Sequence, residues 1–212
     1  MITSLLFDND GILVDTEKYY YRASKEVLSS VGLNLTIELF NHYSLNKGVG
    51  VWEAFEGQLS KELIVHLRSK RDLLYRSYLA SEPIVVKNVE SIVKELSQHY
   101  SMAIITTALK EDFETIHKRT NLLPYFDFYL TNGDYSRSKP HPDPYLAGCE
   151  KMGCVKSTTL VIEDTLRGVR SAKATGIKVV AIPNSFNKND DFSEADYHLD
   201  SIEDLPQLLR HL

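Results

Sequence analysis

Two carboxylates, Asp8 and Asp10, stand two residues apart in the stretch LLFDNDGILVDTE, residues 5–17. The apolar residues just before them indicate the end of a buried strand, because a short apolar run closed by Asp, Asn and Gly is typical of a strand entering a loop. Ligands of open α/β sheets bind beyond the carboxyl ends of the strands. Taken alone, the tetrapeptide Asp-Asn-Asp-Gly at residues 8–11 is better explained as a polar turn. A functional interpretation therefore depends on residues further along the chain.

Polar residues of a matching kind follow three later segments. They are Thr106 and Thr107 after SMAII, Lys139 in SRSKPHPDPY, and Glu163 and Asp164 after TLVI. Each has an ordinary explanation when taken singly: a helix cap, a solvated lysine, the acidic start of a helix. Together they place carboxylates, hydroxyls and an ammonium group at one edge of one predicted sheet, which chance rarely does.

This set of groups suits phosphoryl transfer. Carboxylates from two strand ends form an oxygen-rich site of the kind that Mg²⁺ prefers. With a cation and Lys139 nearby, we expect Asp8 to stay ionised and to be able to attack phosphorus, giving an aspartyl-phosphate. Asp10 can protonate the leaving oxygen and later accept a proton from the attacking water. The hydroxyl of Thr106 and the amides of the following helix start can hold phosphoryl oxygens.

The elements that must position these groups form an α/β fold. After residue 83, helical and strand patterns alternate, which predicts a Rossmann-like, doubly wound parallel sheet with helices on both faces. No convincing strand pattern occurs between Val14 and about Ile84. We therefore predict a catalytic core of residues 1–15 and 84–212, with an inserted α-helical cap domain at residues 16–83. Residues 185–196, SFNKNDDFSEAD, are expected to be a surface loop without a function of its own.

Composition excludes several classes of protein. The 212 residues are 43% hydrophobic and 25% charged, as in ordinary globular proteins. A net charge of −5 argues against a nucleic-acid partner. Cys149 and Cys154 have neither metal-type spacing nor other cysteines to pair with, which favours reduced thiols in a reducing compartment. No stretch predicts a membrane span or a signal peptide, so we expect a cytoplasmic protein with no membrane partner, and a monomer by default.

Four motifs occur in an order that resembles the haloacid dehalogenase superfamily, in its phosphatase and phosphohexomutase branch with an α-helical cap. They are FDNDG at Asp8, IITT at Thr106, KPHPDPY at Lys139, and VIEDTLRGVRSAKATG at Glu163 and Asp164. The resemblance covers essentially the whole chain. It implies a Rossmann-like core, a mobile cap over the site, Mg²⁺ dependence and a covalent aspartyl-phosphate intermediate.

The resemblance also implies roles for single residues. Asp8 would be the nucleophile and a metal ligand, Asp10 the acid/base and a ligand through its backbone carbonyl, and Asp164 a metal ligand. Glu163 would be either a further ligand or a partner that supports the ligands. Ile12 stands where the family most often has Thr or Val, which affects local packing and not the chemistry.

Substrate binding is assigned to residues of both predicted domains: Asn9, Thr107, Glu17, Tyr20 and Lys47. In the family pattern Glu17, Tyr20 and Lys47 lie near the cleft between cap and core. For Lys47 a solvated lysine is an equally good explanation. His117 and His141 have no spacing that indicates metal ligation, and we expect them to be structural or exposed.

The leading functional hypothesis is a Mg²⁺-dependent phosphatase acting on a small phosphomonoester such as a sugar phosphate. A hexose-phosphate mutase of the β-phosphoglucomutase type is the enzymatic alternative, although its pattern has a histidine at Tyr20 and an arginine near Gly50 and Val51. Asp10 argues against a dehalogenase, because carbon–halogen displacement does not need the acid/base that this residue supplies. A receiver-like phospho-accepting domain predicts a shorter chain without the helical insertion. A binding protein without activity would be expected to lack at least one of the four key residues, Asp8, Asp10, Lys139 and Asp164.

Overall fold

The computed structural model describes all residues, Met1–Leu212. The chain divides into two compact units, which we call the core unit (Met1–Asp15 and Val85–Leu212) and the helical unit (Thr16–Ile84). The helical unit thus ends at Ile84, one residue later than the sequence predicts. No helix combines the length and apolar character that crossing a membrane requires.

The core unit is built on a six-stranded sheet in which every neighbouring pair of strands is parallel. The strands are β1 (Ser4–Phe7), β2 (Ser101–Ile105), β3 (Phe128–Leu130), β4 (Thr159–Glu163), β5 (Lys178–Ala181) and β6 (Tyr197–His198). Their order is β3-β2-β1-β4-β5-β6, so that β1 lies at the centre. At its carboxyl end Phe7 is in register with Ile104 of β2 and Ile162 of β4. The parallel α/β fold predicted from the sequence is therefore confirmed, and the polar residues after β1, β2 and β4 come to one edge.

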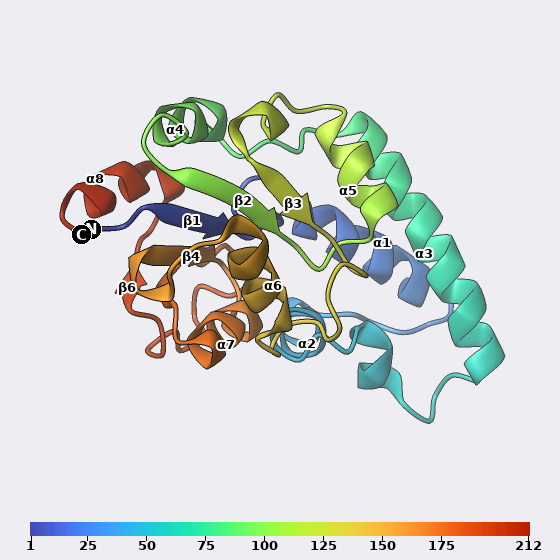
Figure 1. Ribbon diagram of the computed structural model, residues 1–212. Helices are drawn as coiled ribbons and strands as arrows, with labels where there is room; N and C mark the ends of the chain where they lie inside the picture. The colour runs from blue at the N-terminus through green and yellow to red at the C-terminus, as the bar shows by residue number, and fades with distance from the viewer. The chain divides into compact units, whose positions relative to one another are not determined.

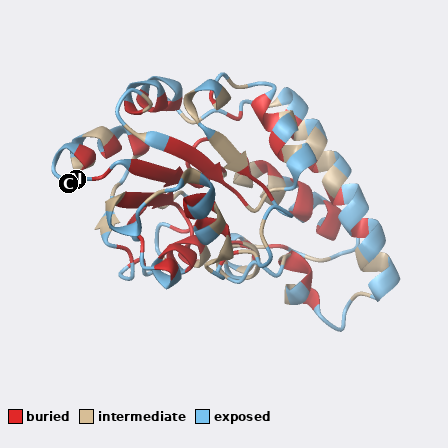
Figure 2. Ribbon diagram, in the orientation of Figure 1, coloured by how far each residue is buried: buried red, intermediate tan, exposed pale blue.

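Helices cover both faces of this sheet (Figure 1). Leu5 and Phe7 of β1 pack in one apolar cluster with α4 (Val89–Leu96), α5 (Lys110–His117) and α8 (Leu205–Arg210). Leu6 packs on the opposite face in a second cluster with α6 (Asp143–Met152) and α7 (Leu166–Thr175). Figure 2 shows the central strands buried along almost their whole length, as expected for a parallel sheet covered on both sides. Three short 3-10 turns complete the core unit: Leu123–Tyr125, Lys156–Thr158 and Ile202–Asp204.

The helical unit contains α1 (Glu17–Ser29), α2 (Ile37–Phe40) and α3 (Lys61–Ser81), with a π-helical turn at Asn41–Asn46 and a 3-10 turn at Val51–Phe55. Helix α3 begins where Ser60 accepts a hydrogen bond from the amide of Leu63, at 3.2 Å. Its buried residues recur at a spacing of four: Leu67, Arg71, Tyr75 and Leu79. This spacing forms one face of a helix, and α3 packs on α1.

The segment between β5 and β6 corrects one expectation. Residues 185–196 are not a plain surface loop, because Asn187, Phe192 and Ala195 are buried. Phe192 and Ala195 belong to the apolar cluster under α6 and α7. Asp196 then accepts a hydrogen bond from the backbone amide of Val179 in β5, at 2.9 Å. The segment is therefore a loop anchored in the core by these buried residues, and Asn187 contributes to the site described below.

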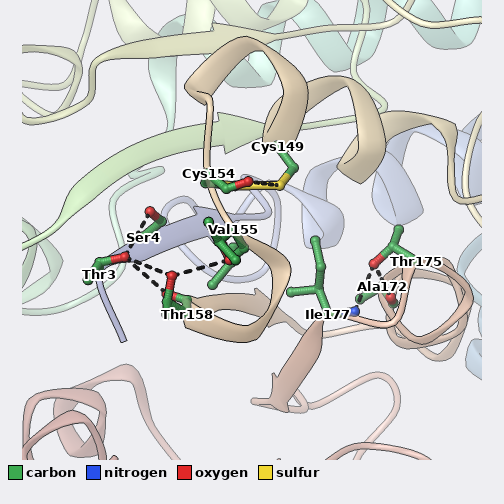
Figure 3. The surroundings of a disulfide bond; sticks show 10 residues. Thr3, Ser4, Cys149, Cys154, Val155, Thr158, Ala172, Thr175 and Ile177 are labelled. Carbon is green, nitrogen blue, oxygen red and sulfur yellow. Dashed lines mark hydrogen bonds between the residues drawn. A yellow bond between two sulfur atoms is a disulfide. The ribbon is translucent and has the colours of Figure 1, made fainter. Parts of the chain in front are cut away.

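The two cysteines are paired, so the expectation of reduced thiols is wrong. Cys149 and Cys154 form a disulfide with a Cα–Cα distance of 5.2 Å. Helix α6 ends at Gly153, where the left-handed backbone (φ +67°) turns the chain back over the last helical turn. The amide of Cys154 donates to the carbonyl of Cys149, at 3.1 Å, and Figure 3 shows the two side chains meeting beside this turn. The end of α6 thus brings Cys149 and Cys154 together, which their spacing in the sequence does not reveal.

The chain leaves the core unit and re-enters it at adjacent points. Val14 and Val85 form an isolated antiparallel β-bridge, and the amide of Val86 donates to the carbonyl of Leu13, at 3.4 Å. The whole helical unit is therefore an insertion between two residues that are paired in the core unit.

Candidate active site

The site begins where three parallel strands end. Asp8 directly follows β1, and its amide donates to the carbonyl of Ile162 in β4, at 2.9 Å. Thr106 directly follows β2, and its amide donates to the carbonyl of Leu130 in β3, at 3.0 Å. Glu163 is the last residue of β4. The hydrogen bonds between neighbouring strands thus extend to Asp8 and Thr106 and fix the backbone positions from which these side chains project.

Lys139 joins two of these strand ends. Its Nζ donates to Asp8 Oδ1 at 2.5 Å, to Glu163 Oε1 at 2.7 Å and to the backbone carbonyl of Ile105 at 3.0 Å. All three side chains are buried, with Lys139 5% exposed, Asp8 8% exposed and Glu163 fully buried. The lysine is therefore an internal cation shared by two carboxylates, and not a solvated surface group.

Burial and mutual charge set the protonation of this cluster. Burial raises the pKa of Asp8 to about 7, and the nearby Glu163 and Asp10 carboxylates add to the rise, while Lys139 opposes it. For Lys139 burial acts to lower the pKa, but the carboxylates of Asp8 and Glu163 outweigh burial and raise it. For Glu163 burial acts to raise the pKa, and the charge and hydrogen bond of Lys139 bring it below its usual value. The ammonium group therefore keeps its proton.

Glu163 is surrounded by hydrogen-bond donors. Its Oε1 accepts from Lys139 and from the hydroxyl of Tyr145, each at 2.7 Å. Its Oε2 accepts from the amides of Asp164 and Thr165 at 3.0 and 3.1 Å, and from the hydroxyl of Thr165 at 3.0 Å. The same hydroxyl caps α7 by accepting from the amide of Gly168, at 3.2 Å. With five donors on its two oxygens, Glu163 holds Lys139 and the start of α7 in place.

Asp164 is held by two asparagines of the segment after β5. Asn184 Nδ2 donates to Asp164 Oδ2 at 2.8 Å, and Asn187 Nδ2 donates to the backbone carbonyl of Asp164 at 2.7 Å. Two glycines leave room for these carboxylates. A Cβ on Gly11, whose φ is +85°, would lie 1.9 Å from Asp164 Oδ2, and a Cβ on Gly168 would lie 1.9 Å from the Glu163 carboxyl group. Only glycine fits at either position.

Asp10 is held by two donors that meet the same oxygen. Thr106 Oγ1 and Asn9 Nδ2 each donate to Asp10 Oδ2 at 3.3 Å. Thr106 Oγ1 in turn accepts from the amide of Ala108, at 3.1 Å. Asn9 is fully buried, with its carbonyl oxygen 2.9 Å from His117 Nε2. This burial argues against the predicted role of the Asn9 side chain in substrate binding.

The remaining residues assigned to substrate binding are Thr107 in the core unit and three residues of the helical unit. Thr107 follows Thr106, and its hydroxyl is 3.4 Å from a terminal nitrogen of Arg167. Glu17, Tyr20 and Lys47 belong to the helical unit. There the Tyr20 ring packs against Tyr75 and beneath the Arg71 guanidinium, and the exposed Lys47 lies over the ring of Tyr43.

Several residues of the site are absent from the sequence-based set: Tyr145, Asn184, Asn187 and His117. Tyr145 lies on the first turns of α6, six residues after Lys139, so a buried aromatic close to the lysine motif was an available signal. Asn187 lies in residues 185–196, for which the sequence predicts a plain surface loop, and Asn184 directly precedes them. His117 is one of two histidines expected to be structural or exposed, and it is 4% exposed.

The acidic residues are arranged so that they could hold a metal ion. Carboxylate oxygens of Asp8, Glu163 and Asp164 all lie within 4.8 Å of one another. A set made of oxygens suits a hard divalent cation. All three carboxylates are close enough together to contribute an oxygen to such an ion, and Glu163 in addition accepts five hydrogen bonds.

Known proteins match this chain over most of its length. The family described as haloacid dehalogenase-like hydrolase matches residues 5–182. The phosphorylated carbohydrates phosphatase of Thermotoga maritima is 30% identical, over 91% of this chain and 90% of that protein. The putative phosphatase YhcW of Bacillus subtilis is 27% identical, over 100% of this chain and 98% of that protein.

Solved structures share the fold. CbbY from Rhodobacter sphaeroides, in complex with phosphate, has a TM-score of 0.79 at 23% identity, covering 97% of this chain and 96% of that one. A β-phosphoglucomutase from Clostridium difficile has a TM-score of 0.81 at 19% identity, covering 100% of this chain and 96% of that one. Similarity at these identities extends to the fold and not to the substrate.

Proposed function

Because this chain belongs to the haloacid dehalogenase-like hydrolase family, we propose that it is a phosphatase that hydrolyses a small phosphomonoester, such as a sugar phosphate, through an aspartyl-phosphate on Asp8. The observation that carries the proposal is the buried contact of Lys139 with Asp8 and Glu163. A cation held at the oxygen of the nucleophile is placed to neutralise the charge that builds up when a phosphoryl group arrives there.

The reaction has two displacement steps. In the first, an oxygen of Asp8 forms a bond to phosphorus while the bond from phosphorus to the ester oxygen breaks, and protonated Asp10 gives its proton to that oxygen as the alcohol leaves. In the second, Asp10 accepts a proton from water as the water oxygen attacks phosphorus, and the bond to Asp8 breaks. Inorganic phosphate leaves, and both carboxyl groups return to their starting states.

The other core residues position these groups. Thr106 donates to Asp10 and lies at the start of the segment that leads into α5. Glu163 receives Lys139 and fixes the direction of its ammonium group toward Asp8. The Lys139–Glu163 hydrogen bond joins buried groups and loses little to competition with water, whereas the Thr106–Asp10 hydrogen bond is partly buried.

We propose that Asp8, Asp164 and the backbone carbonyl of Asp10 hold Mg²⁺, with Glu163 supporting Lys139. When bound, such an ion supplies positive charge to the phosphoryl oxygens and lowers the pKa of nearby carboxylates. That charge matters here because burial, together with the Glu163 and Asp10 carboxylates and against the effect of Lys139, raises the pKa of Asp8 to about 7. The nucleophile must be ionised to attack.

The direct test is a phosphatase screen over a panel of phosphorylated metabolites, with and without Mg²⁺. The Asp8→Asn variant should lose more than ~10³-fold in kcat, because it removes the nucleophile without changing side-chain volume. Asp134→Asn is the matched control, since Asp134 caps a turn after β3 by accepting from Thr131 and has no part in the proposed reaction. Retention of more than a few per cent of the activity by Asp8→Asn would exclude Asp8 as the nucleophile.

A phosphohexomutase is the second candidate, favoured by the likeness to the β-phosphoglucomutase fold. It requires groups that return the phosphoryl group to a sugar and grip a distal phosphate. This chain has Tyr20 where the mutase pattern has a histidine, and Gly50 and Val51 near the place of its arginine. Neither a tyrosine nor these two small residues supplies the two parallel donors of an arginine.

The two candidates are separated by their products. Hydrolysis of β-glucose 1-phosphate, in the presence of a catalytic amount of glucose 1,6-bisphosphate, releases inorganic phosphate, whereas a mutase forms glucose 6-phosphate. We expect phosphate release to dominate. Glucose 6-phosphate formed much faster than phosphate would favour the mutase.

We also propose a cytoplasmic monomer as the working form of the enzyme. Phosphate esters are charged and stay in the compartment where they are made, which supports this location. The proposed site is formed by side chains of one chain. Gel filtration with light scattering on the purified protein tests the oligomeric state, and a mass near 24.1 kDa is expected.

A further inference from the structure

The orientation of the Asp10 carboxyl group depends on Asn9, and the position of Asn9 depends in turn on His117. Of the two donors to Asp10 Oδ2, Thr106 has a hydroxyl that can rotate, whereas Asn9 offers a planar amide with two different ends. Turned one way, Asn9 presents its NH₂ group to Asp10. Turned the other way, it would present a carbonyl oxygen and repel the carboxylate. Whatever holds the Asn9 amide in place therefore supports its contact with Asp10.

His117, at the last turn of α5, holds the other end of this amide. Its Nε2 is 2.9 Å from Asn9 Oδ1, and its Nδ1 is 2.9 Å from Thr120 Oγ1. The Asp10 carboxylate can only accept, so it sets the orientation in which Asn9 turns its NH₂ group to Asp10 and its carbonyl oxygen to His117. With Asn9 in this orientation, the proton of the neutral ring lies on Nε2, and Nδ1 accepts from the Thr120 hydroxyl. The histidine thus anchors the Asn9 amide in the position from which it donates to Asp10.

The surroundings hold the ring in place and keep it uncharged. His117 is 4% exposed, Asn9 is fully buried, and the His117 ring packs against Phe113 with 4.3 Å between the ring centres. Burial lowers the pKa of His117 to about 4, so the ring is neutral near pH 7. The charged groups nearest along its own helix, Glu114 and Lys118, lie on the surface side of α5.

We propose that His117 is a positioning residue for phosphate ester cleavage, acting through Asn9 to aim the Asp10 carboxyl group at the leaving oxygen. This inference rests on the proposed function, since it assigns to Asp10 the proton donated in the first step. His117 touches neither substrate nor phosphorus. Loss of His117 should therefore slow the cleavage of esters that need a proton from Asp10, and it should leave the cleavage of other esters nearly unchanged.

The leaving group supplies that distinction. A sugar alkoxide is a poor leaving group and needs a proton as the ester bond breaks, whereas p-nitrophenolate leaves well without one. The kinetic constant kcat/KM reports the steps up to and including the first cleavage, so it isolates proton donation by Asp10 from the later attack of water. A residue that merely fills the core would lower kcat/KM equally for both kinds of ester.

The experiment compares His117→Leu and His117→Gln with the wild type on p-nitrophenyl phosphate and on glucose 6-phosphate, or on the sugar phosphate that the screen finds best. Glutamine can place its Nε2 donor where the imidazole Nε2 lies, and leucine cannot. For His117→Leu we expect kcat/KM to fall ~10-fold or more with the sugar phosphate and less than ~3-fold with the aryl phosphate. For His117→Gln we expect recovery to within ~3-fold of wild type on both.

Equal losses on the two substrates, or no loss on the sugar phosphate, would overturn the inference. If His117→Leu fails to fold, Asn9→Ala provides the same comparison, because it removes the donor to Asp10 while leaving α5 intact, and the same selective loss is expected. If the wild-type protein hydrolyses neither substrate, the proposed function fails, and the inference fails with it. Unequal losses in the opposite sense would also refute it.

Discussion

Replacing Glu163 by glutamine should destabilise the protein far more than the loss of one charge at the surface would. The wild-type carboxylate accepts five hydrogen bonds, and every partner is a donor. A glutamine has one acceptor oxygen and one NH₂ group. If its oxygen faces the amides of Asp164 and Thr165, its NH₂ group faces Lys139 and Tyr145, so a donor meets an ammonium group.

The size of the effect follows from burial. Glu163 is fully buried and Lys139 is 5% exposed. Removing one partner of a buried ion pair costs about 3 to 5 kcal/mol of stability, because the remaining charge stays desolvated. We expect the lower end, about 3 kcal/mol, because Asp8 and the carbonyl of Ile105 still hold the ammonium group.

Urea unfolding followed by circular dichroism measures this loss. With a slope of about 2 kcal/mol per molar urea, the midpoint should fall by ~1.5 M at an unchanged slope. Glu194→Gln is the matched control: Glu194 pairs with Arg170 at 3.1 Å, but the side chains are 49% and 51% exposed. It should cost less than about 1 kcal/mol. A Glu163→Gln variant as stable as this control would refute the account of the lysine cluster.

Two further results are expected. Excess EDTA should abolish phosphatase activity and Mg²⁺ should restore it, since Asp8 and Asp164 offer oxygens within 4.8 Å; full activity in EDTA would contradict a metal site. Because burial lowers the pKa of His117 from 6.5 to about 4, the unfolded chain binds more protons than the folded protein between these values, and stability falls as the pH falls. Between about pH 7.5 and pH 5, unfolding experiments should show wild type losing ~2 kcal/mol more than His117→Gln, whereas the exposed His211→Gln should track wild type.

The sequence predicts the polar residues at the strand ends, but it does not predict the hydrogen-bond partners that hold these residues in place. Asp8, Thr106, Lys139 and Asp164 could be predicted because parallel strands deliver their carboxyl ends to one edge, and a short polar motif marks each end. The helical insertion could be predicted because the strand pattern is interrupted after Val14. These features depend on local pattern, which a sequence displays directly.

The supporting contacts depend on proximity across long stretches of chain. His117 meets Asn9 across 108 residues, and Asn187 meets Asp164 across 23. No periodicity or spacing rule relates such pairs, so the sequence pattern does not place Asn9 beside His117 or Asn187 beside Asp164. The five donors around Glu163 likewise come from several segments of the chain, and the sequence does not show that they meet.

The pairing of Val14 with Val85 has a consequence for how such a chain can change. Because exit and entry are adjacent in the core unit, the sheet places no demand on the length or the content of what lies between them. Loops closed at neighbouring points tolerate insertions at a small entropic cost. A different helical segment could therefore replace Thr16–Ile84 between these two points while β1 and its neighbours kept their register.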